Sequence, residues 1–309
     1  MIVLITGATG FIGGLLCERL AAAGHSLRML TRNPTATSRL PNPSGKDGAR
    51  AYAWDPEKPA PAQALAGADA VVHLAGESIG AWPWTAERKR RILDSRINGT
   101  RSLVEGMRDL AANGERPRIL VAASAVGYYG NGGEESLAET HAPGQGFLAE
   151  VCVAWEREIF RARELGLRTV AVRNGLVLGR GGVLRKLLPI YRLGGGAVLG
   201  SGRQWWSWIH VEDTVGIFAH ALSDTELEGP VNGCAPQPVT QREFALALAK
   251  AAGRPLWLRA PAFVLEMALG EMAATLLEGQ KTDASKLAGR YAYRYRTLDA
   301  ALENIVTGG

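Results

Sequence analysis

Short apolar runs alternate with amphipathic segments along the first half of the chain. The runs end at glycine, proline or polar residues, as buried strands commonly do. The strands expected from them cover 2–5, 25–31, 50–54, 70–76, 118–123 and 168–173. Apolar positions at helical spacing predict a helix after the first strand and further helices at 85–112 and 146–164. Strands and helices in alternation are typical of an α/β fold, here a doubly wound parallel Rossmann sheet.

The pattern loosens after Arg173, where glycine-rich loops separate shorter elements. Helices are expected near 183–193, 211–222, 240–252, 261–277 and 297–306, and short strands near 206–210, 230–233 and 256–259. We therefore divide the chain into a large domain at 1–173 and a smaller, partly interleaved α/β domain at 174–309. The smaller domain is expected to close over the carboxyl edge of the sheet, where such folds bind ligands, and to supply substrate contacts.

The first strand leads directly into a glycine turn that opens a helix. Gly7 allows the tight turn, Gly10 lets the backbone approach a pyrophosphate, and Gly13 lets the helix pack closely on the strand. The free N–H groups and the positive end of the helix favour that pyrophosphate. The contacts expected from this turn are Gly7, Thr9, Gly10, Phe11, Ile12 and Gly13. The turn predicts a dinucleotide-binding unit, the alternative being a purely structural turn.

The end of the second strand indicates which nicotinamide cofactor fits. An acidic residue there would hold the ribose 2′-OH of NAD, whereas a basic residue suits NADP. No acidic residue occurs between Glu18 and Asp47, and Thr31 and Arg32 stand at the expected place. The Arg32 guanidinium can hold a 2′-phosphate through two charge-assisted hydrogen bonds. We therefore expect NADP(H), the alternative being that Arg32 is an ordinary surface residue on a loop.

Two further strand ends carry candidate cofactor contacts. Asp55 follows the third strand, where it would either accept from the adenine amino group or only start a turn before Pro56. The fourth strand ends in small residues, which leave room for a ligand above the sheet. The contacts expected at that end are Leu74, Ala75, Gly76 and Glu77.

Composition and charge narrow the classes of function. The hydrophobic fraction of 47% and the charged fraction of 21% are ordinary for a soluble globular protein, and the net charge of +5 is small for 309 residues. The basic run Arg88–Arg91 lies inside a helical pattern, so we expect a solvated helix face and no nucleic-acid binding. No apolar run is long enough to span a membrane, and the N-terminus starts with a core strand in place of a signal peptide, which predicts a cytoplasmic protein.

Cysteine and histidine are scattered along the chain. The three cysteines form no paired motif, and the five histidines show no ligand spacing. We therefore expect neither a disulfide framework nor a bound metal.

Several motifs together resemble the extended short-chain dehydrogenase/reductase superfamily. They are Thr6–Gly13, His73–Gly76, Asn98–Thr100, Ser124 with Tyr129–Gly130, and Trp208–Asp213. More narrowly, His73–Ser78, Arg173–Gly179 and Leu277–Lys281 are similar to an atypical branch of epimerase-family, nucleoside-diphosphate-sugar-epimerase-like proteins with a characteristic C-terminal segment. The resemblance implies a Rossmann fold and NADP(H), while the biochemical activity of that branch is largely undefined.

The chain departs from this superfamily at its proton-transfer residues. Working dehydrogenases of the superfamily carry a Tyr-x-x-x-Lys pair on the helix after the fifth strand, where the lysine and the cofactor lower the tyrosine pKa. Alignment of Trp155 and Glu156 with the end of that motif puts Leu148 in place of the tyrosine and Cys152 in place of the lysine. The helix contains no tyrosine or lysine, and Phe147 lacks a hydroxyl.

Other protic residues would have to replace this pair in an active enzyme. The catalytic candidates are Ser124, Tyr129, Glu150 and His210. Ser124, also expected beside the cofactor, is suited to hydrogen-bond a substrate carbonyl or hydroxyl. Each of the others has a structural alternative: Tyr129 as a structural residue or substrate contact, Glu150 as a solvated helix residue, and His210 as a hydrogen-bonded interior histidine.

Two functions therefore remain open. The first is an NADP(H)-dependent oxidoreductase or epimerase that acts on an unidentified small molecule through a non-standard proton donor. The second is a non-catalytic NADP(H)-binding regulatory protein, for example one related to cell division, whose bound cofactor sets its shape for a protein partner. The helices at 85–112 and 146–164 permit a homodimer, and the sequence is equally compatible with a monomer.

Overall fold

Seven parallel strands form the centre of the protein, in a computed structural model that describes residues 1–35 and 49–307. The strands lie in the order β12-β7-β5-β4-β1-β2-β3. Their bounds are β1 (Ile2–Thr6), β2 (Ser26–Thr31), β3 (Arg50–Ala53), β4 (Ala70–His73), β5 (Ile119–Ala125), β7 (Arg168–Asn174) and β12 (Gly229–Gly233). The chain runs outward from β1 in one direction and restarts at β4 in the other, which creates a crevice at their carboxyl ends. This confirms the predicted doubly wound Rossmann sheet.

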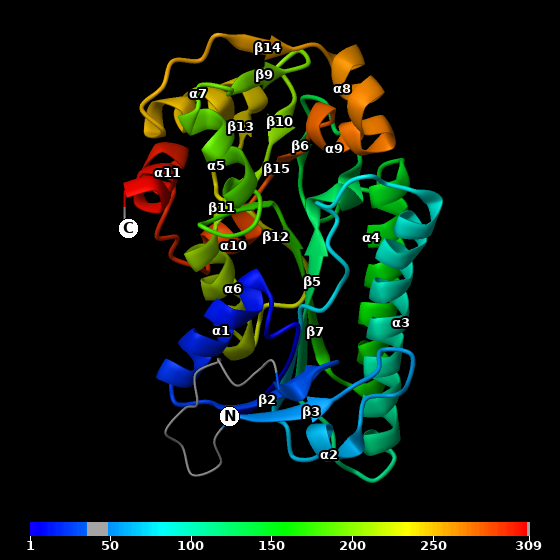
Figure 1. The fold of residues 1–309 in the computed structure, drawn as a ribbon. Helices are drawn as coiled ribbons and strands as arrows, with labels where there is room; N and C mark the ends of the chain where they lie inside the picture. The colour runs from blue at the N-terminus through cyan, green and yellow to red at the C-terminus, as the bar shows by residue number, and fades with distance from the viewer. Residues whose placement is uncertain (36–48, 308–309) are drawn as a thin grey trace.

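Helices cover both faces of the sheet (Figure 1), and the central strands β1, β4, β5 and β7 are largely buried on both sides. Helices α1 (Phe11–Ala22) and α6 (Val211–Ser223) cover one face, and α2 (Ala62–Leu65), α3 (Ala86–Ala111) and α4 (Phe147–Phe160) cover the other. Side chains alternate along each strand, so Val3 and Ile5 enter the first core while Leu4 enters the second.

A smaller lobe lies beyond the carboxyl edge of the sheet, at the top of Figure 1. Its helices α5 (Leu184–Arg192), α7 (Gln241–Ala251) and α11 (Leu298–Thr307) enclose a third core around Trp208 and Phe244. Three short strand pairs belong to it: β8 (Leu176–Leu178) with β11 (Trp208–His210), β9 (Ala197–Leu199) with β14 (Leu258–Ala260), and β10 (Trp205–Trp206) with β13 (Val239–Thr240). Between these segments the chain returns to the large sheet through α6 and β12.

A late segment of the chain joins the two parts. Strand β15 (Lys281–Thr282) pairs with β6 (Ser136–Leu137), which follows the fifth strand of the large sheet. Just before β15, a Cβ at Gly279 would lie 2.4 Å from the Trp205 backbone nitrogen, so no side chain fits there. Gln280 also donates from Nε2 to the Gly130 carbonyl at 2.6 Å. The Leu277–Lys281 motif therefore holds the smaller lobe against the sheet.

Some expected elements differ from the observed ones in their bounds or continuity, and the short elements α2, β6, β8, β9, β15 and α10 (Ser285–Ala288) are not among those expected. The helix expected at 261–277 is three pieces, α8 (Ala262–Leu269), η4 (Gly270–Ala273) and α9 (Ala274–Leu277), because Gly270 takes a left-handed conformation with φ of 57°. Helix α4 ends at Phe160 and continues as the 3₁₀ turn η3 (Arg161–Leu165). Two short elements, η2 (Val126–Tyr129) and α10, complete the structure. Within the described ranges, no helix has the length and apolar character to cross a membrane.

Candidate functional site

The glycine turn lies in the crevice between β1 and β4. Gly7 has a φ of 71°, and a Cβ on it would lie 2.8 Å from the Leu74 carbonyl carbon. A Cβ on Gly13 would lie 2.1 Å from the Gly7 carbonyl oxygen. Both glycines are therefore required for strand, turn and helix to approach one another. Gly10 is exposed beside them, at the start of α1.

The amino end of α1 is open to an anion. Gly10 caps the helix without a side-chain hydrogen bond, and the first turn of α1 contains no acidic residue. Thr9 is exposed and Ile12 is half-buried in the same turn. Free backbone N–H groups and the positive helix end are thus presented at the crevice, as binding of a phosphate group requires.

A buried hydrogen-bond chain supports this turn from below. Thr6 Oγ1 lies 2.7 Å from Nδ1 of His73, whose Nε2 lies 3.0 Å from Thr100 Oγ1, and Trp155 donates to the same hydroxyl at 3.0 Å. Thr6 Oγ1 also accepts from the N–H groups of Leu74 and Ala75 at 3.2 Å. Burial lowers the pKa of His73 to about 4 and keeps the ring neutral. These hydrogen bonds therefore fix β1, β4, α3 and α4 relative to one another.

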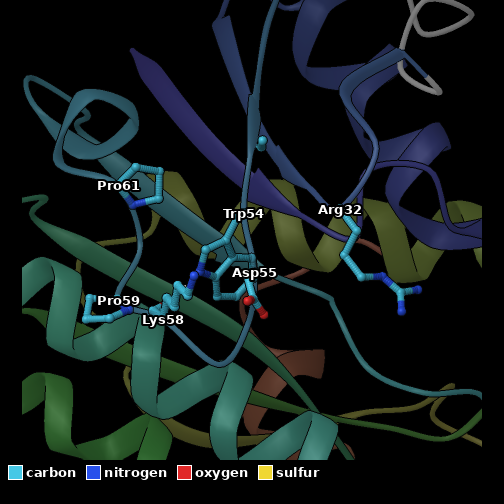
Figure 2. Close-up of a pocket in the computed structure, with 7 residues that line it drawn as sticks. Arg32, Trp54, Asp55, Lys58, Pro59 and Pro61 are labelled. Atoms are coloured by element: carbon cyan, nitrogen blue, oxygen red, sulfur yellow. The ribbon is translucent and has the colours of Figure 1, made fainter.

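A hollow of about 580 Å³ opens at the carboxyl ends of β2 and β3 (Figure 2). Its lining residues are Arg32, Ala53, Trp54, Asp55, Lys58, Pro59 and Pro61. Arg32 is exposed at the end of β2, next to Thr31, whose Oγ1 accepts from the N–H of Asn33 at 3.2 Å. In Figure 2, Asp55 lies between Lys58 and Arg32. The hollow thus combines a tryptophan, two prolines and two cations, which suits a base and a phosphate.

Asp55 has a structural contact as well as a place in this hollow. Its Oδ1 accepts from the N–H of Glu57 at 3.1 Å, and its carbonyl accepts from the N–H of Lys58 at 2.9 Å. The Trp54 indole donates to the Lys58 carbonyl at 3.1 Å and closes the same turn. The turn brings Lys58 to the hollow, and Lys58 is not among the cofactor contacts expected from the sequence. The sequence signal for such a contact is a basic residue shortly after the end of the third strand.

The segment after β4 borders the crevice on its other side. Leu74 and Ala75 are half-buried and Gly76 is exposed. Glu77 pairs with Arg88 of α3 at 3.2 Å. Further along, Lys186 of α5 donates to the Gly80 carbonyl at 2.6 Å, so the smaller lobe touches this loop.

Phe11 connects the helix start with the smaller lobe. A Cβ at Gly179, Gly181 or Gly182 would lie 2.6, 2.4 or 3.3 Å from atoms of the Phe11 ring. The glycine-rich loop after β8 therefore packs directly against this ring. Phe11 thus serves as a packing contact between the two lobes beside the glycine turn.

Ser124 belongs to a buried polar network under the end of β5. It is 2% exposed and donates to Glu156 Oε1 at 2.6 Å. Arg173 holds the same carboxylate with two hydrogen bonds of 2.8 Å, from Nε and Nη2, and donates from Nη1 to the Tyr129 hydroxyl at 2.9 Å. Tyr129 donates onward to Asn232 of β12 at 2.8 Å. The network joins β5, α4, β7 and β12.

The surroundings of Arg173 and Tyr129 keep the arginine charged and the tyrosine neutral. Desolvation alone would lower the pKa of Arg173, but the hydrogen bonds and the charge of Glu156 raise it overall. The guanidinium also lies 3.5 Å from the Tyr128 ring centroid. Burial raises the pKa of Tyr129 to about 12, against the opposing influence of Arg173. Tyr129 thus has both hydrogen-bonding functions occupied and is a weaker acid than an ordinary tyrosine.

Glu150 and His210 lie apart from the network. Glu150 is exposed in the first turn of α4, two residues and about 200° around the helix from Leu148. His210 is 2% exposed; its Nδ1 accepts from the N–H of Glu212 at the start of α6, and its ring stacks on Tyr295 with centroids 3.9 Å apart. Burial lowers the pKa of His210. Within the described ranges, no hydrogen bond or ion pair joins Glu150 or His210 to Ser124 or Tyr129.

Leu148 and Cys152 face the loop that follows β5. A Cβ at Gly127 would lie 3.3 Å from Leu148 Cβ and 3.9 Å from Cys152 Sγ. Cys152 is 3% exposed, and burial raises the pKa of its thiol to about 12. At neutral pH this face of α4 thus offers a hydrocarbon side chain and a protonated thiol.

Comparison with known proteins supplies independent information on the whole chain. The sequence matches the NAD dependent epimerase/dehydratase family over residues 3–232 and a domain of unknown function (DUF1731) over residues 260–305. It is 38% identical over 302 residues to the SDR39U1 homolog of Arabidopsis thaliana, an epimerase family protein described as chloroplastic, covering 96% of this chain and 84% of the relative. It is 36% identical over 308 residues to the epimerase family protein YfhF of Bacillus subtilis, covering 99% and 98%.

A solved structure agrees over the full length. The human epimerase family protein SDR39U1 (isoform 2), crystallised with NADPH, superposes with a TM-score of 0.85 at 33% sequence identity, and 99% of each chain is covered.

Proposed function

Because the chain belongs to the NAD dependent epimerase/dehydratase family, we propose that it binds NADP(H) across the carboxyl edge of its sheet. The observation that carries this proposal is the hollow at Arg32, at the carboxyl ends of β2 and β3, beside the open glycine turn that follows the adjacent strand β1. The 2′-phosphate and adenine lie in the hollow, and the pyrophosphate lies at Gly10 and the start of α1. The human relative that was crystallised with NADPH supports the same choice of cofactor.

Removal of the Arg32 charge tests this assignment. Arg32→Met is expected to weaken NADPH binding by about 10- to 100-fold, because charge-assisted hydrogen bonds to the 2′-phosphate are lost. NADH lacks that phosphate, so its affinity should remain within about twofold. Titration calorimetry or nicotinamide fluorescence measures both ligands on both proteins. Equal losses for NADPH and NADH, or no binding of NADPH by the unchanged protein, would contradict the proposal.

For the reaction, we propose an oxidoreductase-like or epimerase-like activity on an unidentified small molecule with a carbonyl or hydroxyl group. The bound nicotinamide supplies hydride transfer in such chemistry. The supporting observation is that the smaller lobe reaches the segments that border the crevice, through the Lys186–Gly80 hydrogen bond and the contact of the glycine-rich loop with Phe11. Proton transfer would use a group other than a Tyr-Lys pair, since Leu148 and Cys152 occupy those positions.

The alternative is a non-catalytic NADP(H)-binding regulatory protein. The observation that favours it is that two candidate proton donors already donate to protein acceptors. The Ser124 hydroxyl donates to Glu156, and the Tyr129 hydroxyl donates to Asn232. Turnover of NADPH with a panel of carbonyl compounds and sugar nucleotides separates the two functions. Absence of turnover, together with a protein partner whose affinity changes with NADPH, would select the regulatory function. The cytoplasmic location and the oligomeric state stay predictions, and one relative is described as chloroplastic.

A further inference from the structure

Arg96 is a charged residue on the buried face of α3. It lies one turn after Ile92 and one turn before Thr100, both of which are completely buried, while Arg96 itself is half-buried. A basic residue in this stripe departs from the usual apolar pattern of a helix face that packs on a sheet. The position therefore calls for a partner that stabilises the charge.

The guanidinium is fixed at the carboxyl end of β4. A Cβ on Gly76 would lie 3.4 Å from Arg96 Cζ, and Nη1 donates to the Glu77 carbonyl at 3.0 Å. A second bond from Nη1 reaches the Ile92 carbonyl at 3.0 Å. The guanidinium also lies 5.1 Å from the ring centroid of Trp155 on α4. Arg96 thus lies between the segment that borders the crevice and the helix that should carry the catalytic pair.

Much of the hydrogen-bonding capacity of Arg96 is unused. Both of its hydrogen bonds come from Nη1, so Nε and Nη2 have no hydrogen-bond partner in the described part of the chain. The Glu77 carboxylate is near, but it already pairs with Arg88 at 3.2 Å. Burial lowers the pKa of Arg96, and Cys152 and Glu77 oppose that shift. Neither Nε nor Nη2 is among the buried polar atoms that lack a partner in the described ranges, so both are open to solvent and can donate to a bound ligand.

The path of the dinucleotide identifies that ligand. Its adenosine end occupies the hollow at β2 and β3, and its pyrophosphate the glycine turn at β1, so its other half continues toward β4 and β5. Arg96 is at the end of β4, the next strand along this path. Cys152, which replaces the lysine of related dehydrogenases, lies on α4 one turn before Trp155, the ring that Arg96 contacts.

We propose that Arg96 binds the ribose on the nicotinamide side of NADP(H), and that it thereby supplies from α3 a cation that related dehydrogenases place on α4. This inference rests on the proposed cofactor site. Guanidinium donors suit the adjacent hydroxyls of a ribose, because a planar fork can engage two oxygens together. Arg96 is then a cofactor-binding residue, with no part in moving a proton.

Three ligands of decreasing length test the position of the contact. NADPH contains the whole dinucleotide, 2′-phospho-ADP-ribose lacks only the nicotinamide base, and adenosine 2′,5′-bisphosphate ends before the second ribose. Arg96→Met should weaken binding of the first two by about tenfold or more, since charge-assisted hydrogen bonds are lost. Binding of adenosine 2′,5′-bisphosphate should stay within about twofold. Calorimetric titration and the circular dichroism spectrum of each variant are measured together.

Two control variants make the result specific. Arg90→Met removes an exposed charge from the same helix and should change none of the three affinities. Arg32→Met should weaken all three ligands, because each carries the 2′-phosphate. A parallel loss of all three ligands in Arg96→Met would overturn the inference and indicate a structural role for Arg96. A loss confined to NADPH would overturn the ribose contact in favour of the nicotinamide base.

The test also separates this inference from the proposed function. If the unchanged protein binds all three ligands and Arg96→Met binds them equally well, only the role of Arg96 is refuted. If the unchanged protein binds none of them, the NADP(H) site itself is refuted.

Discussion

The buried Glu156–Arg173 pair provides the sharpest test of how the core beneath the site is stabilised. Glu156 is 5% exposed and Arg173 is 2% exposed, and two hydrogen bonds of 2.8 Å join them. In Glu156→Gln the new amide N–H₂ would face a guanidinium N–H, donor against donor. The Arg173 charge would also lose its counter-ion in a desolvated position, where the pKa of Arg173 is raised chiefly through Glu156.

Breaking a buried pair by changing one partner costs about 3–5 kcal/mol in the free energy of unfolding. For a protein of this size we take about 2 °C per kcal/mol, so the thermal midpoint should fall by roughly 6–10 °C. The matched control is Glu164→Gln, which breaks the Arg108–Glu164 bridge, whose side chains are 43% and 64% exposed. That pair contributes about 1 kcal/mol or less, because solvent screens it.

The assay is denaturant and thermal unfolding of both variants without added nucleotide. The double variant Glu156→Gln with Arg173→Met should lose less than the sum of the single losses by about 2 kcal/mol, because it leaves no orphaned charge. A Glu156→Gln variant as stable as Glu164→Gln would refute this account. Additive losses in the double variant would show that the two side chains stabilise the fold independently.

Three further predictions concern the interior and the turn. His73 has a pKa of about 4 in the folded protein, against 6.5 for an ordinary histidine. As the pH falls, the imidazole of the unfolded chain is therefore protonated before that of the folded protein. The contribution of His73 to the free energy of unfolding is complete above pH 6.5 and falls by about 2–3 kcal/mol by pH 4.5. His73→Gln should remove that part of the pH dependence of the urea midpoint, and an unchanged slope would contradict it. Gly13→Ala should abolish NADPH binding or destabilise the protein, because its Cβ would lie 2.1 Å from a carbonyl oxygen, whereas Gly289→Ala, with open space around it, should do neither. Gly279→Ala should lower the thermal midpoint by displacing β15 from Trp205, and an unchanged midpoint would show that the joint between the lobes is looser than its contacts indicate.

Much of this protein follows from local patterns in the sequence. Apolar runs and helical periodicity predict the strands and helices of the Rossmann sheet, because each depends on neighbours a few residues away. The glycine turn is equally local, since Gly7, Gly10 and Gly13 set the backbone of one strand-to-helix connection. Elements of the smaller lobe were also located, although Gly270 divides one expected helix and Ser207 separates two short strands.

The tertiary structure alone decides how distant side chains meet. The sequence named Ser124 and Tyr129 as candidates, but Glu156 and Arg173, their partners, come from α4 and β7. Lys58 reaches the hollow only because a turn at Asp55 directs it there.

Arg96 is a further residue whose contacts cannot be predicted from the sequence. It is not among the residues singled out from the sequence, although it is a charge on the α3 stripe where a hydrocarbon is expected. Which ligand or residue it meets depends on where α3 crosses β4 and α4, and that crossing is set by packing between segments far apart in the chain. The sequence by itself thus determined the sheet and the glycine turn that suits a pyrophosphate, through short-range periodicity and backbone conformation. The tertiary structure decided which charges surround the crevice, because side-chain direction and burial are fixed only when the layers pack together.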